Sequence, residues 1–127
     1  MINWSEYPHF LKEEFDCKHC GANDMKPQFV QILEDLRTDF GKPIAISSGY
    51  RCAYHNKAVS GSGENGPHTT GRAADILING SNALTMLSLA LDAGVRRVGV
   101  SQKGLMRDRF IHIDTSLTHP SPAIWSY

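Results

Sequence analysis

Two histidines and one aspartate are the residues of this chain best suited to hold a catalytic metal ion. His68 and Asp75 stand seven positions apart, and His112 follows thirty-seven residues after Asp75. Two imidazoles and a carboxylate form a ligand set typical of catalytic zinc sites, in which water keeps the fourth tetrahedral position. Zinc lowers the pKa of such a water to about 7, so that it becomes a nucleophile at neutral pH. The sequence therefore predicts a hydrolytic Zn²⁺ site at His68, Asp75 and His112.

The segment around Asp75 suggests how the first two of these residues meet. Gly71 permits a sharp reversal of the chain between His68 and the strand that holds Asp75. Asp75 is the one polar residue of the apolar run 73–78, and a buried carboxylate is costly unless it is paired or binds a cation. Taken singly, each residue also has a structural interpretation, as a loop-capping or core histidine or as a hydrogen-bond hub. Their combination with the glycine-rich loop before them favours metal binding.

Hydrophobic periodicity predicts the elements that position these residues. Apolar residues recur at helical spacing in 27–40, with Pro27 in the first turn and Gly41 as the stop. Two further helices and four strands are predicted, at 53–59 and 82–93 and at 43–48, 73–78, 97–100 and 110–115. Residues 60–67 are predicted to be an irregular loop because four of the eight are Gly or Pro. Residues 116–127 are expected to be extended and to dock on the domain through their apolar end.

Length and charge limit the class of protein. A chain of 127 residues is expected to form a single domain, over 1–127, with one modest core. Thirteen basic and thirteen acidic residues cancel, whereas proteins that bind nucleic acid usually carry a basic excess, so no nucleic acid partner is expected. No apolar run is long enough to span a bilayer, and the first residues lack the pattern of a secretory signal peptide. We expect a protein that is made in the cytoplasm, has no transmembrane segment and acts as a monomer.

The three cysteines leave two interpretations open. Cys17 and Cys20 have the spacing of a zinc knuckle, but no second Cys or His pair of that kind follows them. An odd number of cysteines is not typical of a disulfide scaffold. Free or structural thiols are therefore the favoured interpretation, and a structural zinc site is the alternative.

Several segments of the chain resemble the zinc D-Ala-D-Ala carboxypeptidase family of metallopeptidases, which is structurally akin to the zinc domain of Hedgehog proteins. The shared segments are EFDC at 14–17, SGYR at 48–51, HxxGxAxD at 68–75, HxD at 112–114 and WSY at 125–127. They run over nearly the full length of the chain. The combination of HxxGxAxD with an upstream SGYR and a downstream HxD is specific to this family.

The resemblance implies a fold, a ligand set and a substrate-facing residue. The fold is α+β, with a small central antiparallel sheet flanked by helices. The zinc ligands are the two histidines and the aspartate already singled out, His68, Asp75 and His112. Arg51, in the SGYR segment, is implied to face the substrate, where a guanidinium holds a carboxylate or stabilises an oxyanion. A salt bridge that pins the loop after Gly49 is the structural alternative for Arg51.

The general base departs from the family's pattern. Some relatives carry a glutamate three residues before the last histidine ligand, where this chain has Arg109, and others carry an additional histidine just upstream. Strand alternation places Asp114 on the same face as His112. Asp108 lies on the loop 101–109, which we expect beside the metal, so these two aspartates are the candidate acid–base residues. Asp114 alternatively orients a ligand imidazole. The remaining candidates are His55 and His119.

The resemblance implies a zinc peptidase that cuts peptidoglycan stem peptides, as a D-Ala-D-Ala carboxypeptidase or a cross-link endopeptidase. A single domain without a signal peptide suggests a phage or prophage endolysin, which reaches the cell wall after the membrane is breached. One alternative is an L-Ala-D-Glu endopeptidase of the same family. The other is a non-catalytic zinc-binding module for virion assembly or wall attachment, which the missing glutamate at Arg109 favours.

Overall fold

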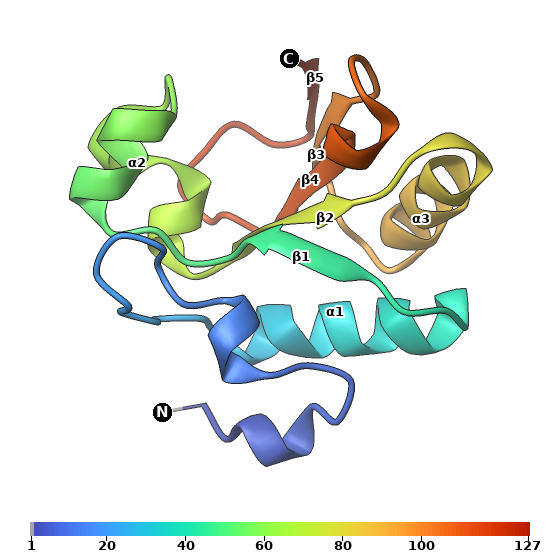
Figure 1. Cartoon of the computed structure of the whole chain (residues 1–127), viewed down its shortest axis with the longest axis horizontal. Helices are drawn as coiled ribbons and strands as arrows, with labels where there is room; N and C mark the ends of the chain where they lie inside the picture. Colours follow the sequence, from blue (N-terminus) through green and yellow to red (C-terminus); the bar gives the residue numbers. More distant parts are fainter. Residues whose placement is uncertain (1) are drawn as a thin grey trace.

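The fold is built on one five-stranded sheet (Figure 1). The structure, a computed structural model, describes residues 2–127. The strands lie in the order β1-β2-β4-β3-β5. Their bounds are Ala45–Ser48 for β1, Ala73–Leu77 for β2, Arg97–Ser101 for β3, Phe110–Asp114 for β4 and Ala123–Ser126 for β5. The predicted α+β class and the four predicted strands are confirmed.

The fifth strand makes the sheet mixed, whereas the sequence predicts an antiparallel sheet. Strands β1, β2, β4 and β3 pair antiparallel, as expected, but β5 runs parallel to β3. The sequence predicts that the tail from residue 116 is extended and docks on the domain. The structure agrees, and residues Ala123–Ser126 of this tail form strand β5, which hydrophobic periodicity did not predict. Pairing with β5 supplies hydrogen-bond partners for the edge of β3, which would otherwise present unpaired backbone groups.

Three α-helices and five short 3-10 helices complete residues 2–127. The α-helices are α1 at Pro27–Phe40, α2 at Ala53–Val59 and α3 at Gly80–Asp92. The 3-10 helices are η1 at Trp4–Glu6, η2 at Lys12–Glu14, η3 at Gly63–Asn65, η4 at Pro67–Thr70 and η5 at Met106–Asp108. The glycine-rich stretch 60–67, predicted to be irregular, thus contains η3 and the start of η4. Within residues 2–127, none of the helices combines the length and apolar character needed to cross a membrane.

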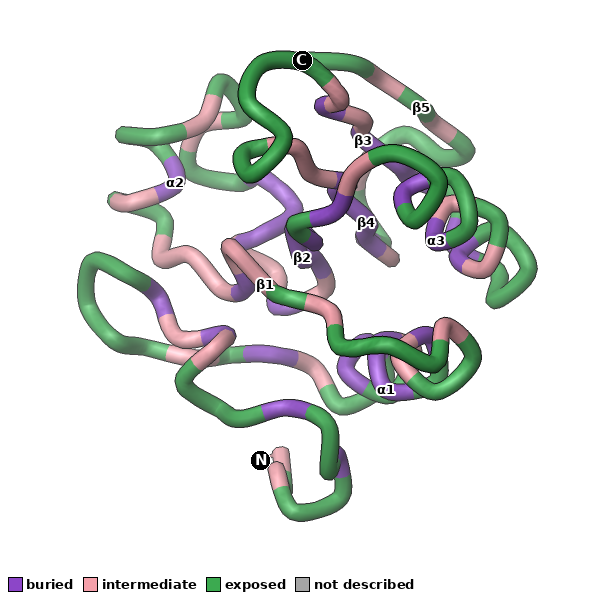
Figure 2. Tube along the Cα trace, turned by 45° about the vertical axis from the view of Figure 1, so that its right-hand side comes forward, coloured by how far each residue is buried: buried purple, intermediate pink, exposed green. Residues whose placement is uncertain are grey.

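One face of the sheet packs against α1 and α3 and forms the core. Side chains alternate across a strand, so every second residue of β2 and β4 reaches this face. Figure 2 shows the buried residues concentrated in the strands and on the inner sides of these two helices. The core residues of the sheet and the two helices include Ala74, Ile76, Ile111, Ile113, Phe29, Leu33, Met86 and Ala90.

The opposite face of the sheet carries polar and aromatic side chains, and strand register sets their positions. Asp75 of β2 lies opposite His112 of β4, His112 lies opposite Gly99 of β3, and Gly99 pairs with Trp125 of β5. These four residues form one row across the sheet. Gly99 is required in this row, since a Cβ there would lie 2.4 Å from Nε1 of the Trp125 indole. The register therefore brings an aspartate, a histidine and a tryptophan together on one face.

Gly71 makes the reversal that brings His68 to this face, and alanine at this position is expected to destabilise the fold strongly. Its φ is +75°, and an added Cβ would lie 1.8 Å from the backbone oxygen of Asp24. Gly41 has the same φ of +75° but no atom within 4 Å of an added Cβ, so it is a matched control. We expect Gly41→Ala to cost about 1–2 kcal/mol of unfolding free energy from backbone conformation alone. Gly71→Ala is expected to cost a further ~1–3 kcal/mol because the chain at Asp24 must move.

Denaturant unfolding of the two alanine variants measures this difference. Equal losses of unfolding free energy at Gly41 and Gly71 would show that the contact with Asp24 does not constrain the reversal.

Candidate metal centre

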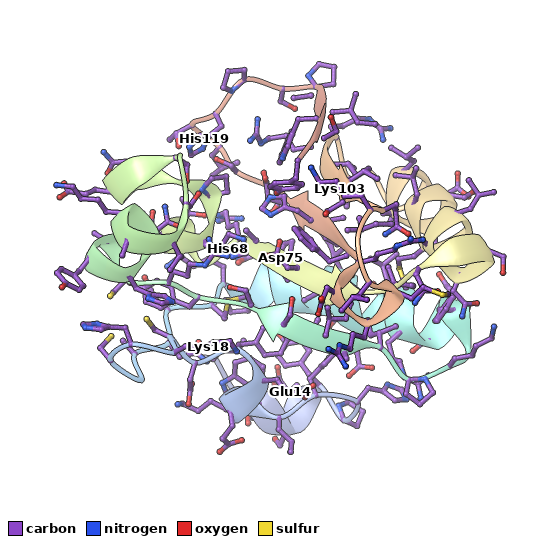
Figure 3. All side chains as sticks on the ribbon, turned by 45° about the horizontal axis from the view of Figure 1, so that its top comes forward. Glu14, Lys18, His68, Asp75, Lys103 and His119 are labelled. Carbon is purple, nitrogen blue, oxygen red and sulfur yellow. The ribbon has the colours of Figure 1, made fainter. Side chains whose placement is uncertain are left out.

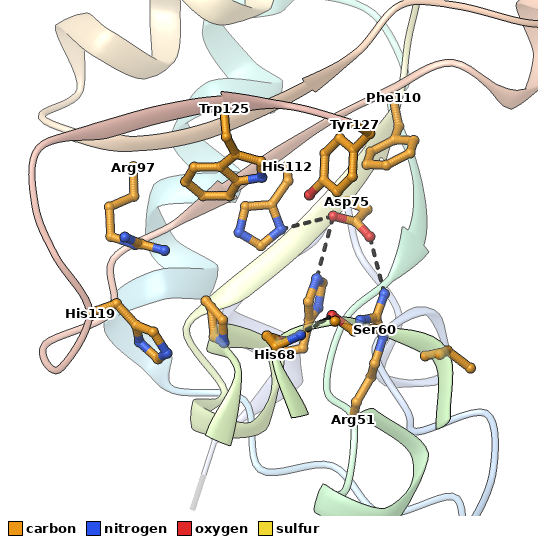
Figure 4. Close-up of a pocket in the computed structure, with 14 residues that line it drawn as sticks. Arg51, Ser60, His68, Asp75, Arg97, Phe110, His112, His119, Trp125 and Tyr127 are labelled. Carbon is orange, nitrogen blue, oxygen red and sulfur yellow. Dashed lines mark hydrogen bonds and ion pairs between the residues drawn. The ribbon is translucent and has the colours of Figure 1, made fainter. Parts of the chain in front are cut away.

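The structure brings His68, Asp75 and His112 together at one point on the polar face of the sheet. One ligand atom from each lies within 4.8 Å of the other two, and all three residues are buried. Oδ1 of Asp75 is 3.4 Å from Nε2 of His68 and 3.0 Å from Nδ1 of His112. Figure 4 shows these contacts as dashed lines in the cleft. The three residues come from η4, β2 and β4, so the site depends on the tertiary structure.

The outer nitrogen of each imidazole is held by a hydrogen bond. Nδ1–H of His68 donates to the backbone oxygen of Gly49 at 2.7 Å. Nε2 of His112 lies 2.7 Å from Oδ2 of Asp114, and an N–H there donates to the carboxylate. Each ring then directs a lone pair at Oδ1 of Asp75, so three acceptors converge. Only a proton or a cation satisfies such an arrangement, and hydrogen bonds of this kind orient the imidazoles of metal sites. The donor set therefore fits Zn²⁺.

Arg51 holds the second oxygen of Asp75. Its Nη2 is 3.4 Å from Oδ2 of Asp75, and its Nε donates to Oγ of Ser48 at 3.0 Å. Its Nη1 donates to Oδ1 of Asn56 at 3.1 Å, and Asn56 is fully buried. The guanidinium is thus fixed by three partners while it lines the cleft. Sequence reasoning singled out Arg51 but missed Asn56, which no motif marked.

A second buried ion pair, between Arg97 and Asp114, holds the imidazole of His112 on the side away from Asp75. Asp114 is fully buried and accepts from Nε of Arg97 at 2.7 Å and from the backbone N–H of Ser116 at 3.0 Å. Its other oxygen accepts from His112, so the carboxylate is shared among three donors. Asp114 does not line the cleft. This geometry matches the orienting role considered for Asp114 rather than proton transfer to a substrate. Arg97 was not predicted, because nothing local distinguishes it from its neighbour Arg96.

The candidate metal centre lies in a cleft of about 510 Å³. Phe110, Trp125 and Tyr127 form an aromatic wall, and the Trp125 ring centroid lies 5.2 Å from that of His112. Figure 3 shows His119 near the top of the molecule, on the chain before β5, and His68 beside Asp75 below it. His119 also lines the cleft. The remaining lining residues are Arg51, Val59, Ser60, Gly61, Ser62, Pro67, His68, Asp75, Arg97 and His112.

The loop 101–109 does not line the cleft, contrary to our expectation. Asp108 is exposed at the end of η5 and is absent from the residues around the cavity. Arg109 donates to the backbone oxygen of Gly104 and lines a groove with residues of α3. Alternation explains the placement of Arg109, because positions 109 and 111 belong to the face that meets the helices. Asp108 belongs to η5, where the alternation of a strand does not apply.

The carboxylates and imidazoles around the candidate metal centre shift one another's pKa values toward their charged forms. Burial alone would raise the pKa of Asp75, but hydrogen bonds from His112 and His68 outweigh burial and hold that pKa well below its usual range. Burial would likewise lower the pKa of His112, but its hydrogen bonds to Asp114 and Asp75 raise it instead. The pKa of Asp114 is lowered against burial by His112, the Ser116 N–H and Arg97. In the metal-free protein these interactions favour a proton on His112, at the place that suits a cation.

The metal-free protein is expected to be most stable in mildly acidic solution. The raised pKa of His112 contributes stability that is fully present below 6.5 and lost as the pH rises through the folded value. The lowered pKa values of Asp75 and Asp114 contribute stability that is present above 3.8 and lost as the pH falls through their folded values. Unfolding of chelator-treated protein over this range measures the effect. Zinc-loaded protein is the control, and an equal decline above pH 6.5 in both forms would contradict the proposed proton on His112.

A comparison with known protein families identifies the family of this chain. A sequence model of the family Peptidase M15 matches residues 8–114. The matched region contains the three candidate metal ligands and Arg51, and it ends with β4, before Trp125. A search of curated proteins finds no match. The α+β fold and the converging ligand set agree with the family match. This chain therefore belongs to the Peptidase M15 family of zinc metallopeptidases.

Proposed function

We propose that this peptidase hydrolyses peptide bonds in the stem peptides of bacterial peptidoglycan, as a D-Ala-D-Ala carboxypeptidase or a cross-link endopeptidase. The observation that carries the proposal is a buried two-histidine, one-aspartate centre with a fixed arginine beside it in an open cleft. The resemblance of the SGYR, HxxGxAxD and HxD segments to D-Ala-D-Ala carboxypeptidases supports the choice of substrate.

The residues of the cleft suit a peptide with a free carboxylate. His68, Asp75 and His112 would hold a zinc ion, which would supply a Lewis acid that lowers the pKa of bound water. Arg51 uses three of its five N–H groups on Ser48, Asn56 and Asp75, which leaves donors for a substrate carboxylate or an oxyanion. Because those partners fix the guanidinium before the substrate arrives, little conformational entropy is lost on binding.

The opposite wall suits the apolar part of the same peptide. Trp125 lies over Gly99, and the Tyr127 ring packs against that of Phe110 at an angle of 52°, with centroids 5.0 Å apart. These rings are held against the sheet by β5. They offer a rigid surface to small aliphatic side chains such as those of alanine.

His119 is the residue of the cleft best suited to transfer protons. The carboxylates considered for this step, Asp108 and Asp114, do not line the cavity. Among the lining residues within 2–127, His119 is the one imidazole that is not a candidate metal ligand, and imidazole is the side chain that most often serves as a general acid or base. Its Nδ1 is paired with Oγ of Ser116, which holds the ring. We expect His119→Gln to lower kcat by about 10²–10⁴-fold while zinc remains bound.

The matched control for this variant is His55→Gln. His55 lies on α2 and does not line the cleft. Steady-state hydrolysis and metal analysis of both variants measure the effect. An unchanged kcat in His119→Gln would remove His119 from proton transfer.

Digestion of purified muropeptides followed by mass spectrometry tests the proposed function. Release of D-alanine identifies a carboxypeptidase, and conversion of cross-linked dimers to monomers identifies an endopeptidase. Cleavage between L-Ala and D-Glu would assign the alternative activity of the same family. His68→Ala serves as the inactive control. Clearing of isolated cell walls tests the further proposal that the enzyme acts in lysis for a phage or prophage.

A non-catalytic zinc-binding module is the second candidate, and the residue that favours it is Arg109. It stands where some relatives carry a catalytic glutamate, and its side chain lies on the α3 side of the sheet, away from the cleft. Zinc retained by the wild type together with intact muropeptides would establish this candidate in place of the enzyme.

A further inference from the structure

A second cluster of metal-binding side chains lies outside the cleft, where all three cysteines of the chain meet. Cys17 and Cys20 belong to the loop between η2 and α1, and Cys52 caps the N-terminus of α2. Their sulfur atoms all lie within 4.8 Å of one another. The three thiols are free. Figure 3 shows Lys18, which lies between Cys17 and His19 in sequence, on the same side of the molecule as His68.

The separations in this cluster suit a tetrahedral zinc ion. A Zn–S bond of about 2.3 Å places two thiolates of a tetrahedral site about 3.8 Å apart, and a thiolate and an imidazole nitrogen slightly closer. Nδ1 of His19 lies 3.8 Å from Sγ of Cys52. A disulfide would use two of the sulfurs and leave the third beside it without a partner. A single ion can use all three sulfurs, and His19, which lies beside Cys52 but outside the group of three, is available as a further donor.

The backbone around the cluster is arranged as it would be around thiolates. The N–H of Cys52 donates to Sγ of Cys17 at 3.4 Å, and the N–H of His55 donates to Sγ of Cys52 at 3.4 Å. Backbone hydrogen bonds also close the loop that holds Cys17. The backbone N–H of Cys17 donates to the backbone oxygen of Ala22, and the backbone oxygen of Cys17 accepts from the N–H of Gly21. N–H donors of this kind favour the charged form of the sulfur, which is the form that binds metal.

We propose that Cys17, Cys20 and Cys52 bind a structural zinc ion, with His19 as the fourth ligand. Four protein ligands make a closed site, in contrast to the open position of the centre in the cleft. The site would join the N-terminal loop to the residue that directly follows Arg51. Two hydrogen bonds already hold this segment, from the N–H of Tyr50 to the oxygen of Phe15 and from the N–H of Arg51 to the oxygen of His68. The structural zinc thus holds the segment that carries Arg51 in place.

Cobalt substitution of the full chain tests the proposal without relying on activity. Cobalt bound by thiolates has an intense charge-transfer absorption in the ultraviolet, which a site made of imidazole and carboxylate lacks. We expect this band in the wild type and in His68→Ala, and its loss in Cys20→Ser. Cys20 is exposed, so the serine variant is expected to fold. Zinc analysis should give two ions per chain in the wild type and one in each variant.

Thiol reactivity and a pair of histidine variants complete the test. In zinc-loaded protein the three thiols should be protected from a thiol reagent and become reactive when a chelator is added. His19→Gln should weaken cobalt binding and shift the visible bands, whereas the matched control His55→Gln should leave both unchanged. Thiols that react freely in zinc-loaded protein, a disulfide found by mass spectrometry, or a wild type without the charge-transfer band would each overturn the site. Identical spectra for the two histidine variants would overturn the role of His19.

Discussion

Replacement of His112 by alanine is expected to remove the zinc ion of the cleft and to lower peptide hydrolysis by at least about a thousandfold. His112 supplies one of the three converging acceptors, and its ring is fixed between Asp75 and Asp114. Without the imidazole, two ligands remain, too few for a stable catalytic site. Metal analysis and muropeptide hydrolysis on the same preparation measure both effects.

The control for this variant is His55→Ala, which removes an imidazole outside the cleft. We expect the His112 variant to hold one zinc ion per chain fewer than this control. Its charge-transfer band with cobalt should persist, because the cysteine cluster is separate from the cleft. A His112 variant with normal zinc content and normal hydrolysis would refute the assignment of the metal centre.

Asp114→Ala is expected to produce the largest loss of stability among the variants of the site. The substitution leaves Arg97 largely buried without its carboxylate, and breaking a buried ion pair in this way costs about 3–5 kcal/mol of unfolding free energy. It also frees Nε2 of His112, so the ring loses its orientation. Asp114→Asn keeps the volume, and we expect it to weaken zinc binding by about 10–100-fold.

The matched control is Asp108→Asn, since Asp108 is the other aspartate considered for catalysis and is exposed. Denaturant unfolding and competitive zinc titration should leave this control within about 0.5 kcal/mol of the wild type. A loss of kcat in Asp114→Asn with unchanged zinc affinity would assign Asp114 to proton transfer instead of orientation.

The row Asp75, His112, Gly99 and Trp125 links the stability of the sheet to the geometry of the cleft. Three of the four strands in this row pair antiparallel, and the fourth, β5, is held parallel at the edge. Trp125 and Tyr127 of the aromatic wall therefore lie outside the residues matched by the family model, whereas Phe110 lies within them. Variation in β5 would change the aromatic wall and, through the contact between the Trp125 and His112 rings, the surroundings of a candidate metal ligand.

The sequence by itself identified the three residues that meet in the cleft and most of the elements that carry them. Helix α1 was predicted at its observed bounds because its signals are local: apolar spacing, a proline in the first turn and Gly41 after the last residue. His68, Asp75 and His112 were recognisable because a histidine or aspartate among apolar neighbours is costly without a partner. The chain reversal at Gly71 was predictable from the sequence because glycine readily adopts a positive φ, which is a property of that single residue.

Tertiary structure alone decided which side chains support the ligands and which merely lie near them in sequence. Arg97 meets Asp114 because β3 and β4 pair in one register, and no local pattern encodes the register of strands distant in sequence. Cys52 joins Cys17 and Cys20 across more than thirty residues, which a search for a second cysteine pair does not detect. Asp108, close to His112 in sequence, lies outside the cleft. Local periodicity predicts which face of a strand or helix a side chain occupies. The packing and register of whole elements decide which other side chains it contacts on that face.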